Sequence, residues 1–167
     1  TNISSDALAG FSQTFYSSDK GIADVDNSGR VSINKAGKVT FTARLYKEQP
    51  DGGTVYKEIS KNIEMKKISH SLVPVEGKEY KKEIYTKQDG SAQYVSNADD
   101  YDGTITYSFS DANSAGLVDT IGDFKESGQW KAKDTYGKVK VKVVAPATDK
   151  YERVDTSYTT TIVQYDY

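Results

Sequence analysis

The chain has 167 residues, of which 22 are Lys or Arg and 24 are Asp or Glu, so its net charge of −2 lacks the basic excess of a nucleic-acid-binding domain. It has no Cys, which excludes disulfides, thiolate catalysis and Cys-ligated metals. The longest apolar runs, such as residues 143–145, are far shorter than the roughly 18 residues that a membrane span needs. Apolar residues (AVILMFWYC) make up 36%, a share that favours thin domains burying one face of each element over a thick, enzyme-like core.

The first part of the chain is predicted to form strands. Residues 13–16 are rich in residues that favour strands, and residues 39–45 alternate between apolar and polar side chains, which is the period of a half-buried strand. Turn sequences rich in Asp, Asn, Pro and Gly follow each of them, at residues 26–29 and 50–53. These patterns predict two strands with turns between the elements.

Residues 58–68 are ambiguous by periodicity. Ile59 and Ile63 fit one face of a helix, but Val55, Ile59, Ile63 and Met65 also fall on one face of a strand. The neighbouring strand patterns favour a strand here.

The second part of the chain has the same character. Strand patterns occupy residues 104–109, 138–143 and 158–163, and turn sequences occupy residues 100–103 and 145–149. Little of the chain has helical periodicity, so the predicted fold class is all-β.

An internal repeat predicts two domains. The two clearest matches are residues 37–41 with 137–141, and residues 16–19 with 108–111. The second copy is the longer between these landmarks. Two copies of one β unit predict domains at residues 1–68 and 69–167, with the junction at residues 67–71.

The first copy resembles the bacterial immunoglobulin-like domain, group 2, which occurs in intimin- and invasin-type adhesins and in surface-layer proteins. Residues 16–26 resemble the family's "Y-S-S-(D/N)…(I/V)-A-x-V-D" signature, residues 28–31 its "x-G-x-V" hairpin, and residues 36–43 its "A-G-x-(A/V)-T-(I/V)-T-A" segment. The resemblance implies two tandem immunoglobulin-like antiparallel β-sandwich domains.

Both copies depart from this pattern. In the second copy, residues 127–130 (Ser-Gly-Gln-Trp) replace the usual hairpin, and residues 112–123 form a longer connection than expected. In the first copy, only about a dozen residues precede Gln13, where the family has two strands. We therefore expect the first domain to be truncated at its N-terminus or to take its first strand from elsewhere.

Four residues have expected structural roles. Tyr16 and Tyr107 can each place a ring in the core while the hydroxyl reaches a polar partner. Gly37 and Gly137 each begin a predicted strand, where a glycine suits a turn or a close backbone approach.

The sole histidine, His70, lies between two serines at the predicted junction. A Ser-His-Asp system needs a nucleophile on a sharp turn and a buried base, but the chain has no Gly-x-Ser-x-Gly sequence. We expect an exposed linker residue and predict that the protein is not an enzyme.

An acidic turn is the candidate ion site. Residues 97–103 hold four oxygen-bearing side chains, among them Asp99, Asp100 and Asp102, which together with backbone carbonyls could hold calcium. The alternative is an acidic surface turn. Residues 24–29 also resemble the start of a calcium loop, but Lys35 stands where the bidentate Glu belongs. No other cofactor is predicted.

Two surface features complete the candidates. Tyr101, between two Asp residues, is the predicted ligand-contact residue, because a tyrosine ring can stack on a sugar face. Lys138, Lys140 and Lys142 form a basic stripe that we assign to the solvent face of a strand.

The resemblance implies a non-enzymatic structural or spacer module of a bacterial cell-surface protein, either an adhesin stalk or a surface-layer lattice domain. Its expected location is extracellular, at the cell surface. Its expected partners are neighbouring domains of the same protein, with self-assembly or a host or glycan ligand as further options, and neither nucleic acid nor membrane insertion. The alternative is a carbohydrate- or calcium-binding accessory module of a secreted enzyme or a phage tail protein.

Overall fold

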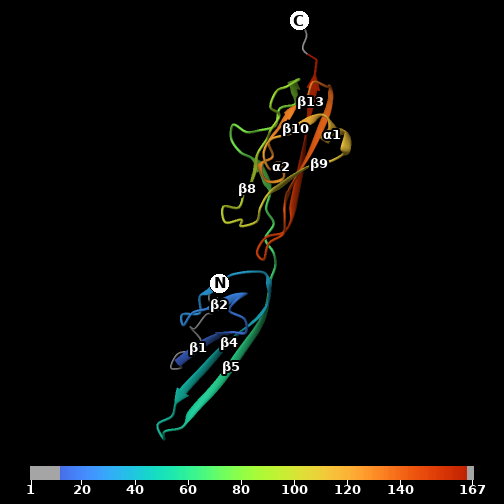
Figure 1. The fold of residues 1–167 in the computed structure, drawn as a ribbon. Helices are drawn as coiled ribbons and strands as arrows, with labels where there is room; N and C mark the ends of the chain where they lie inside the picture. The colour runs from blue at the N-terminus through green and yellow to red at the C-terminus, as the bar shows by residue number, and fades with distance from the viewer. Residues whose placement is uncertain (1–11, 165–167) are drawn as a thin grey trace. The chain divides into compact units, whose positions relative to one another are not determined.

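Strands make up almost all of the regular structure (Figure 1). The computed structural model describes residues 12–164 and divides the chain into two compact units, Thr1–Lys67 and Ile68–Tyr167. About 51% of it is strand and 6% helix, which confirms the all-β prediction. Within the described range, the helices are α1 (Ala112–Gly116) and α2 (Phe124–Ser127), and neither is long and apolar enough to cross a membrane.

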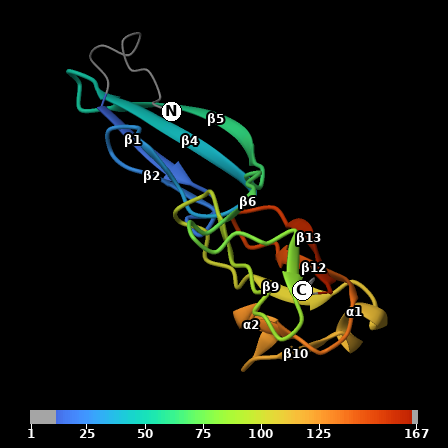
Figure 2. The same ribbon diagram turned by 90° about the horizontal axis from the view of Figure 1, so that it is seen from above.

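The first unit is a three-stranded antiparallel sheet with a hairpin on one face. The order in the sheet is β1 (Ser12–Ser17), β4 (Gly37–Glu48), β5 (Thr54–Met65), and Figure 2 shows β4 and β5 side by side. The hairpin consists of β2 (Ala23–Val25) and β3 (Val31–Ile33). The hairpin and the sheet share a core, and its buried members are Phe15, Ala23, Val25, Val39, Phe41 and Ala43. The strand prediction for the ambiguous segment is confirmed up to Met65.

The second unit has a four-stranded sheet of order β7 (Glu83–Tyr85), β13 (Val154–Val163), β12 (Gly137–Ala145), β9 (Thr106–Phe109). Its neighbours are antiparallel except for β7 and β13, which run parallel. The parallel pair is a departure from the predicted antiparallel sandwich.

Two antiparallel strand pairs form the other layer of the second unit. One pairs β6 (Leu72–Pro74) with β8 (Tyr94–Ser96), and the other pairs β10 (Val118–Thr120) with β11 (Trp130–Ala132). A bridge between Asp89 and Lys131 connects them. None of these short strands was predicted, because three residues are too few to show an alternating pattern.

The two units share one strand plan. In each, the same three strands are neighbours, β1-β4-β5 in the first and β9-β12-β13 in the second, and a hairpin follows the first of them, β2-β3 and β10-β11. Among the described residues of the first unit, β6, β7 and β8 have no counterparts.

The core of the second unit is built around Trp130. Its side chain is fully buried, and its Nε1–H donates to the Tyr158 hydroxyl at 3.0 Å. Burial raises the pKa of Tyr158 to about 12. The Tyr158 ring also stacks on Tyr94, with ring centroids 6.0 Å apart. The Trp130 indole N–H thus finds an acceptor in the Tyr158 hydroxyl within an apolar interior, where an unpaired donor would be costly.

The structure assigns different roles to the two tyrosines that were expected in the core. Tyr107 is buried, and its hydroxyl accepts from the Tyr94 N–H at 3.0 Å, as expected. Tyr16 is 45% exposed. Phe15 lies opposite Ala43 just as Tyr107 lies opposite Val143, so Phe15 is the true counterpart. A shift of one residue exchanges the two faces of a strand, which is why the prediction was wrong for Tyr16.

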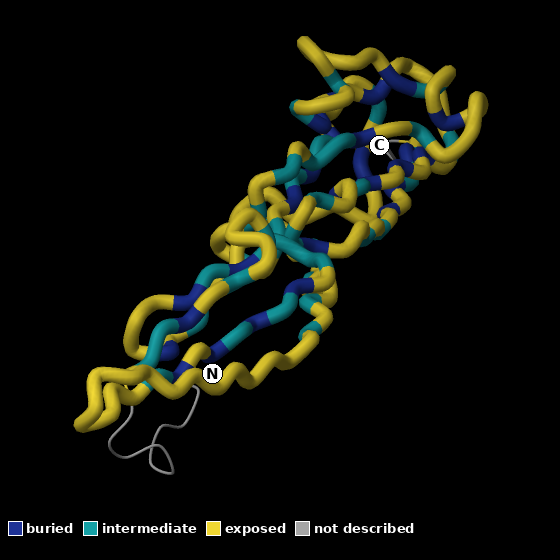
Figure 3. Tube along the Cα trace, turned by 90° about the horizontal axis from the view of Figure 1, so that it is seen from below, coloured by how far each residue is buried: buried dark blue, intermediate teal, exposed yellow. Residues whose placement is uncertain are grey.

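Buried and exposed positions alternate along β4 and β12 (Figure 3), whereas β5 is exposed at nearly every position. In β12, alternate valines are fully buried, while Lys138, Lys140 and Lys142 are exposed. The stripe therefore lies on the solvent face, as expected. Because β12 is an interior strand of its sheet, these lysines do not protect a sheet edge.

A glycine begins the central strand of each unit and leaves room for an apolar side chain. Gly37 and Gly137 both have φ of +149°. A Cβ on Gly37 would lie 2.6 Å from Ile22 Cδ1, and a Cβ on Gly137 would lie 2.9 Å from Leu117 Cδ1. Both distances are shorter than a normal van der Waals contact, so the two glycines make the close approach that the sequence predicts.

We expect Gly137→Ala to lower the free energy of unfolding by about 1–3 kcal/mol, because the methyl group must displace Leu117 and the backbone is unfavourable for alanine. Urea unfolding of the 167-residue chain measures this change. Gly116→Ala is the matched control, since a Cβ there meets no atom within 4 Å. A Gly137→Ala protein as stable as the wild type would contradict the assignment.

Candidate functional site

One of the predicted ion residues, Asp100, and the predicted contact residue, Tyr101, lie in one cluster at an end of the second unit's strands. We call the set His70, Asp100, Tyr101, Lys150 and Tyr151 the His70 cluster. His70 comes from the first residues of the unit, Asp100 and Tyr101 from the loop between β8 and β9, and the last two from the loop between β12 and β13. The structure thus brings together His70 and the acidic turn, which the sequence treated separately.

Three aromatic rings form the centre of the His70 cluster. His70 stacks on Tyr101 with centroids 4.7 Å apart and an interplanar angle of 30°. Tyr151 lies 5.3 Å from His70 and meets Tyr101 edge-on at 5.9 Å. Such geometries are favourable beyond the area that they bury. The three rings therefore tie three separate segments to one another.

Both ring nitrogens of His70 are engaged. Nε2 lies 2.7 Å from the Glu152 carbonyl oxygen, and Nδ1 lies 2.7 Å from Ser96 Oγ. A carbonyl oxygen only accepts, so Nε2 carries a hydrogen and, in the neutral ring, Nδ1 accepts from the Ser96 hydroxyl. His70 is half-buried, and the expectation of an exposed linker residue is wrong for it.

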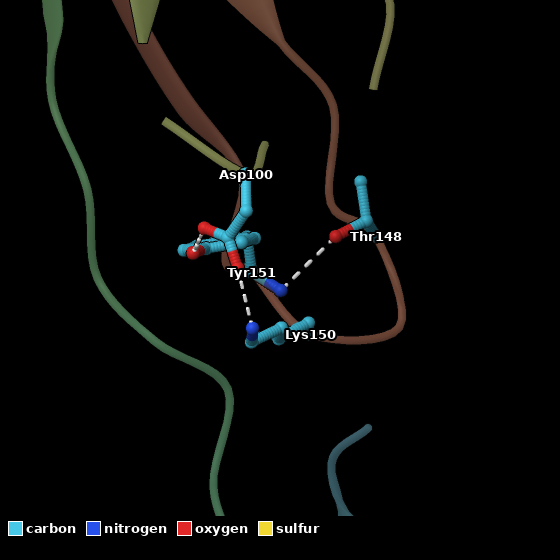
Figure 4. A network of polar contacts seen from close by, with 4 residues as sticks. All are labelled: Asp100, Thr148, Lys150 and Tyr151. Atoms are coloured by element: carbon cyan, nitrogen blue, oxygen red, sulfur yellow. Dashed lines mark hydrogen bonds and ion pairs between the residues drawn. The ribbon is translucent and has the colours of Figure 1, made fainter. Parts of the chain in front are cut away.

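The Asp100 carboxylate is held by two donors (Figure 4). Lys150 Nζ donates to Oδ2 at 2.5 Å, and the Tyr151 hydroxyl donates to Oδ1. The bond from Lys150, with that from Tyr151, lowers the pKa of Asp100. The same bonds to Asp100 raise the pKa of Lys150 and the pKa of Tyr151. At neutral pH, the cluster therefore holds an ion pair supported by a phenol.

The three aspartates proposed for calcium differ in what surrounds their carboxylates. Both oxygens of Asp100 face protein donors, one of which is a cation, while Asp99 and Asp102 are exposed. No group of three or more His, Asp or Glu side chains in residues 12–164 is arranged to hold a metal ion. Calcium binding by the turn stays a prediction, which the melting temperature with and without a chelator would test.

In the loop at residues 24–29, the carboxylate of Asp26 accepts hydrogen bonds from the loop itself. Asp26 Oδ1 accepts from the backbone N–H of Ser28 and of Arg30, each at 2.9 Å, and from the Ser28 hydroxyl. These bonds lower the pKa of Asp26, the Ser28 hydroxyl contributing most. The carboxylate here caps a turn.

Tyr101 is half-buried rather than free at the surface. Its hydroxyl donates to the Pro146 carbonyl oxygen at 2.6 Å, and burial raises its pKa. One face of its ring lies on His70. Tyr101 thus links two loops, and its role as a ligand-contact residue stays a prediction.

A Ser96–His70 pair, which the sequence did not indicate, has the geometry of part of a catalytic site. A hydroxyl within hydrogen-bond reach of an imidazole, with the base oriented by a third group, is the minimal arrangement for a nucleophile. Here the third group is a backbone carbonyl, and Ser96 Oγ also accepts from the Ala98 N–H at 3.0 Å. With the ring stacked on Tyr101, the pair serves to fix loops.

We expect Asp100→Asn to lower the melting temperature at neutral pH. Because the folded-state pKa of Asp100 is lowered, its carboxylate stabilises the fold above the ordinary Asp pKa of about 3.9 and loses this effect as the pH falls through the lowered value. The difference from wild type should therefore shrink in acid. Melting curves across pH measure it, with the exposed neighbour Asp102→Asn as the control. A difference independent of pH would contradict the ion pair.

Comparison with known proteins gives one family match. Residues 7–44 match the family model of the intimin immunoglobulin-like domain, which confirms the resemblance over its signature residues. A sequence comparison with curated proteins gave no match.

The chain is also similar to several solved structures. They are protocadherin gamma B2 extracellular cadherin domains 3–6 (13% identity, TM-score 0.43, 95% of this chain and 44% of that one), surface layer protein SbsC domains 1–6 (10%, 0.45, 93% and 20%) and mouse protocadherin-24 EC1–3 (10%, 0.41, 92% and 59%). The chain spans less than two thirds of each of these proteins.

Proposed function

We propose that the chain is a non-enzymatic structural module of a bacterial cell-surface protein, which spaces other domains in an adhesin stalk or a surface-layer lattice. The match of residues 7–44 to the intimin immunoglobulin-like domain supports an extracellular adhesion or structural role. A spacer must above all resist being pulled apart. The observation that carries the proposal is therefore how the second unit bonds its first residues to its last strand.

The second unit is anchored from its first residue. The Ile68 N–H donates to the Lys150 carbonyl oxygen at 2.9 Å, and the Glu152 N–H donates back to the Ile68 carbonyl oxygen at 2.9 Å. These bonds form a parallel bridge between Ile68 and Tyr151. Only Lys66 and Lys67 separate Ile68 from the end of β5. Tension that enters from β5 thus reaches a hydrogen-bonded residue after only two intervening residues.

The strand β7 continues this arrangement farther along the unit. It pairs in parallel with the end of β13, Ile84 lying opposite Ile162, and the Thr161 N–H donates to the Lys82 carbonyl oxygen at 2.9 Å. Ile84 and Ile162 are both buried. In a parallel pair, pulling the start of one strand against the end of the other loads all the bonds together. The pairing thus opposes separation of the two ends of the unit.

Pulling direction tests this load path. The chain has no cysteine, so an engineered cysteine gives a unique handle for force spectroscopy. With one handle at the C-terminus and the other at Lys67→Cys, the force shears the β7–β13 pair. With the second handle moved to Lys87→Cys, just beyond β7, the same pair is opened bond by bond. We expect a higher unfolding force in the first geometry.

Equal forces in the two geometries would remove the mechanical basis of the proposal. The melting temperatures of both cysteine variants serve as the control, because they must match the wild type for the forces to be compared. Ordered two-dimensional assembly of the chain would then favour the lattice role, and a monomer that binds host cells or matrix would favour the adhesin stalk.

The absence of catalysis belongs to the same proposal. The Ser96–His70 pair is the group to test, with an activated ester as substrate. We expect no turnover above buffer, because the hydroxyl and both ring nitrogens are engaged within the fold. If the wild type turns over the ester and a folded His70→Ala variant does not, the protein is an enzyme.

A further inference from the structure

The outer face of the first unit's sheet holds a group of exposed aromatic and charged side chains. The register places Arg44 opposite Glu58 and Tyr46 opposite Tyr56, and Tyr16 lies two positions along on β1, opposite Thr42. All five side chains project from the face opposite to the buried Phe41 and Ala43. We call Tyr16, Arg44, Tyr46, Tyr56 and Glu58 the Tyr face.

The second unit shows that this kind of sheet does not need such residues. The corresponding outer positions of β9, β12 and β13 are Thr106, Ser108, Lys138, Lys140, Lys142, Val144, Asp155, Ser157, Thr159, Thr161 and Val163. None is aromatic. By register, Ser108 stands where the first unit has Tyr16, and Val144 opposite Asp155 stands where it has Arg44 opposite Glu58. The fourth strand of that sheet, β7, adds the exposed Tyr85 beside Val163, but without a second ring or an Arg–Glu pair next to it on these strands. The combination of rings and ion pair in the Tyr face is therefore specific to the first unit.

The side chains of the Tyr face are ordered by one another. The Arg44 guanidinium lies 5.3 Å from the centroid of the Tyr16 ring, and its Nη2 lies 2.7 Å from Glu58 Oε1. The Tyr46 and Tyr56 rings are 6.5 Å apart at 42°. Tyr56 remains 66% exposed. The face thus presents oriented rings next to a planar donor–acceptor pair.

A shallow depression of about 360 Å³ lies at the edge of this face, lined by Arg44, Tyr56, Lys57 and Glu58. It is open to solvent and does not surround a ligand as the cleft of a small-molecule site does. It combines one exposed ring with both members of the ion pair. A ligand here would be one or two sugar rings in size rather than a folded protein surface.

Charge restricts the class of ligand. On the outer face, Arg44 is balanced by Glu58, and Lys38 lies opposite Glu64. Glu48 adds one acid to this face, and Lys57 adds one base at the depression. A balanced face has no field to attract a phosphate chain or another strongly charged polymer. Between the two charge pairs, polar side chains bond in rows, Thr40 to Asn62 at 2.7 Å and Thr42 with Ser60 at 3.0 Å. The surroundings therefore suit a neutral ligand with many hydroxyl groups.

We propose that the Tyr face is a binding site for a neutral saccharide chain. A pyranose ring has an apolar C–H face, which can lie on an exposed tyrosine ring, and a rim of hydroxyls. Neighbouring hydroxyls can accept from the Arg44 guanidinium and donate to the Glu58 carboxylate, and the Tyr hydroxyls offer further polar contacts. The site belongs to the first unit, whereas the predicted contact residue Tyr101 belongs to the second, and the proposal goes beyond the spacer role.

A glycan array of neutral oligosaccharides, probed with the 167-residue chain, identifies the ligand, and calorimetry of the best hit gives its Kd. We expect Tyr56→Ala to weaken binding about tenfold or more, because it removes the most exposed ring. Glu58→Gln keeps the shape of the side chain and should also weaken binding. Lys140→Ala, on the outer face of the corresponding sheet in the second unit, is the matched control and should leave Kd unchanged.

Three results would overturn the proposal. The first is an array without a neutral saccharide hit, and the second is binding that persists unchanged in both Tyr56→Ala and Glu58→Gln. The third is binding only to anionic glycans that salt abolishes, since this would assign the ligand to the lysines. Melting curves of each variant show that the fold is kept. If Tyr56→Ala unfolds the unit, Glu58→Gln decides.

Discussion

Every other feature depends on the register of one long antiparallel strand pair in each unit. Gly37 lies opposite Met65 in the first pair, and Gly137 lies opposite Ile162 in the second. The side-chain period of a strand is two, so this register decides which residues enter the core and which meet solvent. It buries the valines of β12 and sets the lysines outside. In the first unit, the same rule places Tyr46 beside Tyr56 on the exposed face.

The His70 cluster depends on this register indirectly, through the loop between β12 and β13. The turn that joins β12 to β13 holds Lys150 and Tyr151, so the strand pair fixes where their side chains can reach. Asp100 and His70 come to them from other parts of the chain and supply the charge and the ring that complete the contacts. The loops are therefore ordered by a few specific side chains, whereas the strands are ordered by a repeating pattern.

This difference explains what could be predicted from sequence. The strands β4 and β12 alternate between apolar and polar residues and were predicted from that pattern, β13 was predicted from its residues that favour strands, and β5 was assigned from its neighbours. The strands β6, β7 and β8 are three residues each and were not predicted. A repeat in the sequence locates the two units but does not tell on which side of the sheet each side chain lies. For this reason Tyr16 was assigned to the core in place of Phe15. The cluster joins His70 to Tyr151, and the bond from Ser69 to Glu152 next to it joins residues 83 positions apart. No local pattern reports such contacts.

The close approach of each strand-initial glycine to an apolar side chain has an evolutionary consequence. Gly37 and Ile22 occupy one volume together, as do Gly137 and Leu117. A larger residue at either position would meet both a filled volume and a backbone conformation that favours glycine, so we expect relatives to keep glycine there even where the apolar partner changes. The same constancy is expected in both units, which would show that they share not only an order of strands but one way of closing the sheet on the hairpin.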